Sequence, residues 1–398
     1  MYRRIIRLAI RIFYILRVLV NSLWAIPAVI VIRLLKPILH IQICQINSER
    51  IGHFTADIAE HIARSNFKIP HVLKVYYFHK IANMQWETMA RRSNLITVGS
   101  WVQYLDKWNQ LMPGGDAHVL KTSLTGSRDT NGLLSRFDAS IPFLPTENAA
   151  AENWLRSKGW TKGEPIVVIL VRDSEYLKEI KPLINWDYHN YRDSDVMTYL
   201  PAMEWLASQN VWVIRMGKSM ATRVVSDKNR IIDYAFDSKK SDLLDIWLFA
   251  NCTGVISTGS GPDSLAAIYR KPILFVNYIP LVEVWTWANS ITEFKHLKWI
   301  KNGRKLNLNE YLNNNILHGF QYQDKGIEIV DQTAQEILLA VQNFWINLNG
   351  NIESSILEEK FWLQVTASPN FQECNNWIHP NCRIGIGWLA AQDRDFFA

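Results

Sequence analysis

Cysteine is scarce in this chain of 398 residues, which contains four Cys residues and no Cys-x-x-Cys pair. So few thiols exclude the disulfide framework of a small secreted domain and favour a reducing, cytoplasmic compartment. Cys374, His379 and Cys382 could supply three metal ligands, but no fourth ligand lies near them in the sequence. We therefore expect no metal and no resident cofactor.

Acidic residues are almost lacking from the first 50 positions, where Glu49 is the single carboxylate against eight Lys and Arg. This segment has a net charge of +7, and because the whole chain is +6 the remaining 348 residues sum to −1. A nucleic-acid interface would place basic stripes on a folded domain. Here the positive charge lies on an apolar leader, so we expect no nucleic-acid partner.

Residues 1 to 39 form this leader. Its basic residues Arg3, Arg4, Arg7, Arg11 and Arg17 fall within an arc of about 140° on a helix and leave the rest of the surface apolar. Such a helix is attracted to an anionic membrane surface. The uncharged run from 18 to 32 is shorter than the roughly 20 residues of a comfortable span and contains Pro27. We expect an interfacial helix, with a short span ending at Arg17 and Arg33, or a buried hairpin, as alternatives.

Internal repeats and low-complexity tracts are also lacking, and the length predicts two domains. From residue 40 onward, short apolar runs alternate with amphipathic stretches, which indicates βαβ units and parallel sheets buried on both faces. Strands are predicted at 41–46, 72–77, 166–171, 211–215, 254–257 and 271–276, and helices at 54–64, 147–158, 197–208, 242–251 and from about Pro262.

The predicted fold class is therefore α/β, with two Rossmann-like, doubly wound domains. The first covers residues 40–160 and the second 161–345. The leader, 1–39, precedes them and a C-terminal extension, 346–398, follows them.

A glycine-rich turn follows the predicted strand 254–257, although the Gly-Lys-Ser/Thr of a P-loop is lacking. Glycine permits close backbone approach, and amides at the start of a helix attract an anion. The anion-binding residues predicted here are Thr258, Gly259, Ser260, Gly261, Asp263 and Ser264. The alternative is a tight packing corner.

Basic residues follow two other predicted strands. Arg172 follows 166–171, and Arg215, Gly217 and Lys218 end or follow 211–215. In an open α/β sheet, ligands bind beyond the carboxyl ends of the strands, and arginine there suits a phosphate. A single arginine is more often a surface ion pair, but three such strand ends together favour a diphosphate site.

Three residues are candidates for the general base or acid. Asp173 follows the same strand as Arg172, and His189 lies in a polar, aromatic loop at 188–195 that has no apolar periodicity. Arg192 in the same loop is predicted to bind the nucleotide-sugar and not to act as a base. His53 follows Gly52 at the start of a predicted helix and would face a ligand. The alternatives are a hydrogen-bonded loop for His189 and a structural role for His53.

Several of these motifs together resemble a family of bacterial glycosyltransferases associated with surface-polysaccharide clusters. The matching motifs are Arg50-Ile51-Gly52-His53, Val171-Arg172-Asp173-Ser174 with Tyr176, His189-x-Tyr191-Arg192, Val213-Ile214-Arg215-Met216-Gly217 and Gly259-Ser260-Gly261-Pro262. The likeness covers roughly residues 40 to 320. It implies a GT-B fold, in which the C-terminal domain holds a nucleotide-sugar and the N-terminal domain holds the acceptor.

The combined expectation is a glycosyltransferase at the cytoplasmic face of the inner membrane. It would move a sugar from a nucleotide-sugar donor to a lipid-linked or polysaccharide acceptor, and basic residues would stabilise the leaving diphosphate without a metal. Two alternatives are a nucleotide-sugar epimerase of the same fold, for which the leader has no use, and a noncatalytic scaffold of polysaccharide assembly.

Overall fold

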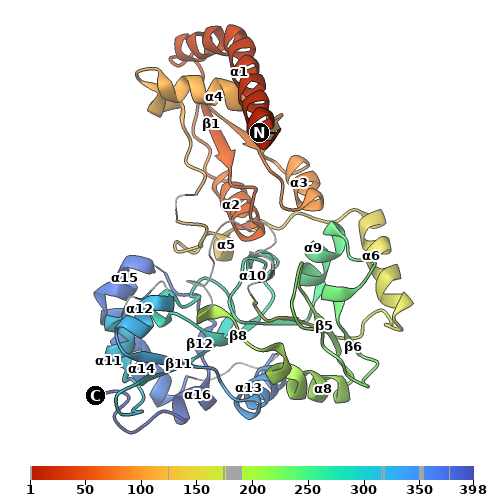
Figure 1. Ribbon diagram of the computed structural model, residues 1–398, viewed down its shortest axis with the longest axis vertical. Coiled ribbons are helices and arrows are strands. Elements are labelled where there is room, and N and C mark those ends of the chain that lie inside the picture. The colour runs from red at the N-terminus through yellow and green to blue at the C-terminus, as the bar shows by residue number, and fades with distance from the viewer. Residues whose placement is uncertain are drawn as a thin grey trace. The chain divides into compact units, whose positions relative to one another are not determined.

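A computed structural model describes residues 2–123, 125–173, 175, 191–314, 316, 319–348, 354–375 and 377–398 (Figure 1). The chain divides into two units, Met1–Ser127 and Arg128–Ala398. The boundary expected near residue 160 thus lies earlier in the chain. The reason is that helix α6, Pro145–Ser157, packs against α9, Asp242–Asn251, where the Trp247 indole donates a hydrogen bond to Asn148 Oδ1 at 2.9 Å.

Unit 1 begins with one long helix and continues as a small α/β fold. Its elements are α1 (Tyr2–Leu34), β1 (His40–Ile46), α2 (Ile51–Arg64), β2 (Val72–Phe78), α3 (Met84–Arg91), β3 (Ile96–Val98), α4 (Val102–Leu111) and η1 (Gly115–His118). The three strands form a parallel sheet in the order β1-β2-β3. The strands expected at 41–46 and 72–77 are therefore confirmed, with the helix between them.

Side chains alternate across this sheet and bury both of its faces. Ile43 and Tyr77 contact α1 and α4, and the Tyr77 hydroxyl donates to Asp106 Oδ2 at 2.8 Å. On the opposite face, Cys44 and Tyr76 lie against His61 of α2. The unit is thus wound on both sides of its sheet.

The leader does not stand apart from unit 1, because the second half of α1 packs against α4. Ala25, Val29 and Ile32 are buried in that contact. Arg33, expected at one end of a membrane span, instead donates to the carbonyls of Asn109, Met112 and Pro113 at the C-terminal end of α4, at 3.0, 3.2 and 2.6 Å. By length and composition alone, the segment Leu16–Leu34 of α1 could cross a membrane.

Unit 2 is a larger α/β fold. Its first elements are α5 (Leu133–Arg136), α6, β4 (Ile166–Leu170), η3 (Val196–Tyr199), α8 (Leu200–Ser208), β5 (Trp212–Arg215), β6 (Ile231–Ile232), η4 (Tyr234–Phe236), α9, β7 (Gly254–Ser257) and α10 (Asp263–Ile268). The later ones are β8 (Ile273–Tyr278), η5 (Leu281–Glu283), β9 (Ser290–Phe294), β10 (His296–Trp299), α11 (Leu308–Asn313), α12 (Gly319–Asp324), β11 (Ile327–Val330), α13 (Ala334–Ile346), α14 (Ile356–Ala367), α15 (Pro369–Cys374), β12 (Cys382–Ile384) and α16 (Ile386–Ala390).

Seven strands of unit 2 form one parallel sheet in the order β12-β9-β8-β7-β4-β5-β6. Helices α8 and α13 cover one face, and α9 and α10 lie on the other (Figure 1). The predicted strands 166–171, 211–215, 254–257 and 271–276 correspond to β4, β5, β7 and β8. The C-terminal extension supplies β12 at one edge, paired with β9.

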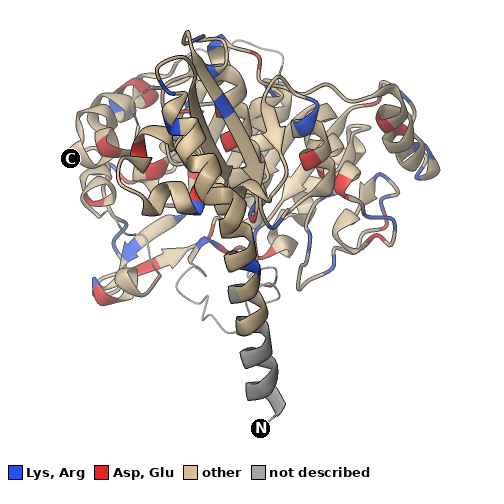
Figure 2. Ribbon diagram, turned by 90° about the horizontal axis from the view of Figure 1, so that it is seen from above, with Lys and Arg blue, Asp and Glu red and all other residues tan. Residues whose placement is uncertain are grey.

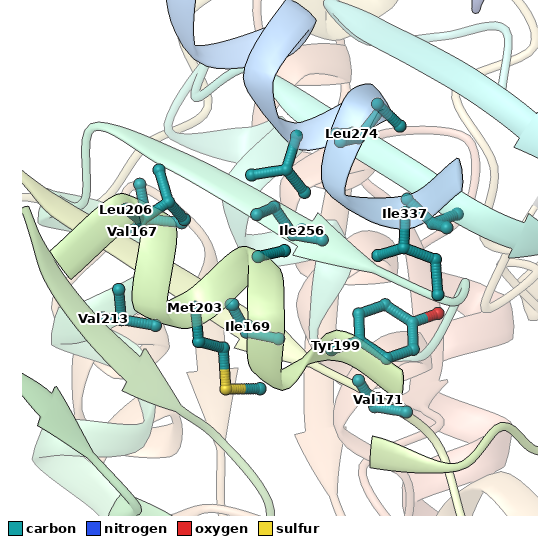
Figure 3. Packing of buried hydrophobic residues seen from close by; sticks show 14 of the residues in the cluster. Val167, Ile169, Val171, Tyr199, Met203, Leu206, Val213, Ile256, Leu274 and Ile337 are labelled. Atoms are coloured by element: carbon teal, nitrogen blue, oxygen red, sulfur yellow. The ribbon is translucent and has the colours of Figure 1, made fainter. Parts of the chain in front are cut away.

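The core under α8 and α13 holds the central strands in place. Figure 3 shows Val167, Ile169, Val213 and Ile256 of the sheet facing Met203 and other helix residues. All five of these side chains are fully buried. Because alternate residues of β4 and β7 are packed so tightly, the positions at which these strands end are fixed, and so are the loops that follow them.

Candidate functional site

The three strand ends singled out in the sequence lie side by side, because β7, β4 and β5 are consecutive in the sheet. Their parallel register places Ser257 of β7 beside Leu170 of β4, and Ile169 beside Arg215 of β5. All three therefore deliver their following loops to one edge, which is where parallel α/β sheets bind ligands. The expected convergence of the strand ends is confirmed.

The turn after β7 is closed largely by its own residues. Ser260 N donates to Asp263 Oδ2 at 2.5 Å, and the Ser257 hydroxyl donates to the same oxygen at 2.8 Å. Gly259 N donates to the Ser257 Oγ at 3.1 Å. Asp263 is fully buried, and burial raises its pKa to about 7. The side chain of Asp263 thus occupies the position that an external anion would take.

This arrangement changes the prediction that the turn binds an anion through its backbone amides. The amide of Thr258 donates to Leu170 O at 3.2 Å, so of the four amides at 258–261 only that of Gly261 has no acceptor among the residues that the structure describes. Ser264 is turned inward, since its hydroxyl donates to Gly261 O at 2.8 Å. The turn is mainly a tight corner, and charged side chains must provide most of any binding.

Arg172 is held directly above this corner. Its amide donates to Thr258 Oγ1 at 3.0 Å, which ties the ends of β4 and β7 together. Its guanidinium Nε lies 3.2 Å from Asp193 Oδ1. Burial is the main reason that the pKa of Arg172 falls to about 10, and the nearby positive charge of Arg192 lowers it further. Two guanidinium groups are thus close enough to repel each other.

Arg192 reaches the same turn from the loop before η3. Its Nη2 donates to the carbonyl of Gly259 at 3.0 Å. No carboxylate among the described residues lies within ion-pair distance of Arg192, and its buried Nε has no hydrogen-bond partner among them. A guanidinium with an unused donor beside a second guanidinium is a favourable environment for a phosphate.

A third cation, Lys295, lies behind these arginines. It directly follows β9, and its Nζ donates to Asp193 O at 2.6 Å and lies 2.7 Å from Asp331 Oδ1. Burial lowers the pKa of Lys295, while Asp331 opposes that change. Lys295 is almost fully buried and so supports the Asp193 segment from within the fold. Lys295 was not among the predicted site residues, because no strand was predicted where β9 lies.

The structure does not bring Arg215 to this cluster. Its guanidinium is fully buried and lies 3.0 Å from Asp233 Oδ1. Since β5 ends at Arg215 and β6 is its neighbour, the side chain joins these two strands instead of facing a ligand. Gly217 and Lys218 do follow at the ligand edge, where Lys218 Nζ is half-exposed and lies 3.9 Å from Asp242 Oδ1.

The candidate bases have different surroundings. Both carboxylate oxygens of Asp173 accept backbone amides, from Glu175 at 3.1 Å and Ala221 at 3.0 Å, so Asp173 organises two loops. His189 lies outside the described residues. His53, at the start of α2 in unit 1, is half-buried, and burial followed by the charge of Arg50 lowers its pKa. A neutral imidazole is the form that can accept a proton.

His53 has partners that the sequence reasoning missed. Its Nδ1 lies 2.6 Å from the Ser127 Oγ, and the Ser127 hydroxyl donates to Asp57 Oδ1 at 2.7 Å. Burial raises the pKa of Asp57 to about 7. The signal was available in part, because His53 and Asp57 are four residues apart on one helix face. The contribution of Ser127, distant in sequence, could not be foreseen.

The sequence matches no protein-family model and no curated protein. Among solved structures, the chain is similar to a glycosyl transferase of family 9 from Veillonella parvula, with 11% identity and a TM-score of 0.41, over 64% of this chain and 86% of that one. It is also similar to the ADP-heptose LPS heptosyltransferase II of E. coli, with 10% identity and a TM-score of 0.41, over 77% of this chain and 99% of that one.

Proposed function

We propose that this protein is a glycosyltransferase that moves a sugar from a nucleotide-sugar donor to a lipid-linked or polysaccharide acceptor. The observation that carries the proposal is the pair Arg172 and Arg192 at the ligand edge of the seven-stranded sheet. Arg192 has no carboxylate within ion-pair distance among the described residues, whereas Arg172 pairs with Asp193 and Lys295 pairs with Asp331. The positive charge of Arg192, beside the guanidinium of Arg172, suits a diphosphate.

In the reaction, an acceptor hydroxyl oxygen forms a bond to the anomeric carbon of the sugar. The bond from that carbon to the distal phosphate oxygen breaks, and the nucleoside diphosphate leaves with the electron pair. Arg172 and Arg192 stabilise the negative charge that develops on this leaving group, a role that a metal serves in other enzymes. In an inverting transfer, the hydroxyl proton passes to a general base, for which His53 is our candidate.

The proposed location is the cytoplasmic face of the inner membrane, with α1 lying along the membrane surface. Between residues 16 and 34, α1 carries only Arg17 and Arg33 as charged residues (Figure 2). Apolar side chains that are exposed on one stripe of the helix are Leu16, Leu19, Val20, Leu23, Ile30, Val31 and Leu34. At about 100° per residue these lie opposite Ala25, Val29 and Ile32, which pack against α4. A helix with one face on protein and one apolar face outward fits a bilayer surface better than a span.

Flotation with anionic vesicles tests this location. Leu23, whose side chain is 79% exposed, is changed to Glu, and Leu363→Glu on α14, where the leucine is 72% exposed, is the matched control. We expect Leu23→Glu to reduce the vesicle-bound fraction and Leu363→Glu to leave it unchanged. Equal loss in both variants, or no loss in either, contradicts the membrane-facing role of α1.

A thermal-shift screen against a panel of nucleotide-sugars tests the activity itself. We expect one donor to raise the melting temperature and to release its nucleoside diphosphate when a glycan acceptor is present. Conversion of the donor to another sugar without an acceptor would instead indicate an epimerase. Absence of any nucleotide binding would favour a noncatalytic scaffold.

A further inference from the structure

A buried carboxylate, a serine and a histidine form one hydrogen-bonded chain in unit 1. Asp57 lies one helical turn after His53 on α2, with its side chain fully buried. Ser127, from the loop that ends the unit, lies between them, 2.6 Å from His53 Nδ1 and 2.7 Å from Asp57 Oδ1. This series of hydrogen bonds therefore joins the start of α2 to a loop more than 70 residues away in sequence.

The proton positions in this chain follow from counting donors. Ser127 has a single hydroxyl proton, and it is donated to the Asp57 carboxylate. The Ser127 oxygen can then only accept from His53, so the imidazole carries its proton on Nδ1. Its other nitrogen, Nε2, is left with a lone pair, and it makes no hydrogen bond to any residue that the structure describes.

The loop around Ser127 is built to hold this geometry. Ser127 adopts φ +64, a left-handed conformation that is unfavourable for residues other than glycine. Its amide donates to Ser123 Oγ at 2.6 Å, and Ser123 and Thr125 hydroxyls point to Glu60 Oε2 at 3.4 and 3.3 Å. Non-glycine residues persist in this conformation where the surroundings enforce it, and they cluster at functional sites.

From this geometry we infer that Ser127 and Asp57 are positioning residues that fix His53 in the Nδ1–H tautomer and so leave Nε2 as a proton acceptor. The inference rests on the proposed glycosyl transfer for its purpose, because an attacking hydroxyl must lose a proton. When Nε2 accepts a proton, Ser127 keeps its hydroxyl proton and Asp57 stays ionised.

The test reads the tautomer of His53 directly. Full-length protein labelled with 15N-histidine is studied by two-bond 1H–15N correlation at pH 8, where Asp57 is ionised, and His53→Gln identifies the signals. We expect a pyrrole-type Nδ1 and a pyridine-type Nε2. Ser127→Gly, which removes the hydroxyl and suits the left-handed backbone, is expected to reverse this pattern in favour of Nε2–H, the form that predominates in free imidazole side chains.

Two further variants keep the test decisive. Asp57→Ala is expected to reverse the tautomer as well, because the Ser127 hydroxyl loses its acceptor and turns to donate to Nδ1. Thr88→Ala on α3, which removes a hydroxyl that donates to the Met84 carbonyl, is the matched control in unit 1 and is expected to leave the tautomer unchanged. An Nε2–H tautomer in the unaltered protein, or an Nδ1–H tautomer that survives in Ser127→Gly, overturns the inference.

This measurement needs no substrate, so it separates the inference from the proposed function. A protein that shows the Nδ1–H tautomer but binds no nucleotide-sugar refutes the glycosyl transfer and leaves the positioning geometry intact. With a donor identified by the panel, Ser127→Gly is expected to lower kcat by about 10²-fold with KM unchanged, since general base catalysis contributes about 10²–10⁴-fold.

Discussion

Replacing Gly259 by Ala tests how the corner after β7 supports the arginine pair. Gly259 has φ +83, and a Cβ atom there would lie 2.7 Å from Tyr278 Cε2. The Tyr278 ring cannot easily move, because its hydroxyl donates to Glu283 O at 2.7 Å and its edge contacts Phe275. Alanine thus lowers the free energy of unfolding in two ways, by about 1–2 kcal/mol for the left-handed backbone and by about 1–3 kcal/mol for overpacking against Tyr278.

The matched control is Gly303→Ala, also in unit 2. Gly303 has φ +69 and no neighbouring atom within 4 Å of an added Cβ, so only the backbone penalty applies. We expect the free energy of unfolding, measured by urea denaturation, to fall by about 2–5 kcal/mol for Gly259→Ala and by about 1–2 kcal/mol for Gly303→Ala. Equal losses would refute the clash with Tyr278. Nucleotide affinity should fall only for Gly259→Ala, since the carbonyl of residue 259 accepts the hydrogen bond from Arg192 Nη2.

Three other substitutions test separate contacts. Arg215→Ala should lower the free energy of unfolding by about 3–5 kcal/mol, since it leaves Asp233 without its buried partner; a fully stable variant by urea denaturation would contradict this. Because burial raises the pKa of Asp263 from 3.8 to about 7, the folded state binds the extra proton and stability falls as pH rises between these values. Asp263→Asn should therefore reduce the loss of stability between pH 5 and pH 8 by about 2–3 kcal/mol, and an unchanged pH dependence would refute the shift. Arg33→Ala removes the donors to the carbonyls at the C-terminal end of α4 and should speed hydrogen exchange there; unchanged exchange would contradict that role.

Much of the large sheet could be predicted because its central strands are buried on both faces. Such strands read as continuous apolar runs, and β4 and β7 begin at the predicted residues. The helix predicted at 242–251 matches α9, and Ser241 caps it by accepting a hydrogen bond from Leu244 N at 3.2 Å. Strand β12 was missed because it is three residues long and its partner β9 lies about 90 residues earlier. Pairing at that separation depends on the fold as a whole.

The candidate site was predictable where it depended on topology alone. Consecutive strand ends identified Arg172 with the turn it contacts, since parallel strands deliver their loops to one edge, whereas Arg192 was named from the polar loop at 188–195. The direction of a single side chain was not predictable. Arg215 turns toward Asp233 because β6 lies beside β5, and Ser260 N meets Asp263 because the helix begins within the turn. The direction of each side chain depends on neighbouring residues in space, which the local sequence does not reveal.

Nucleotide affinity of two arginine variants tests the central claim most directly. The nucleoside diphosphate that best stabilises the protein is titrated by calorimetry into the unaltered protein, Arg192→Ala and Arg230→Ala. Arg230 precedes β6 and pairs with Glu164 at 2.8 Å, at the other end of the strands. We predict that Arg192→Ala weakens binding by about 10- to 150-fold, the value of one charge-assisted contact of about 1.5–3 kcal/mol, and that Arg230→Ala leaves it unchanged. An Arg192→Ala protein that binds as tightly as the unaltered one would contradict the claim that this arginine pair holds the diphosphate.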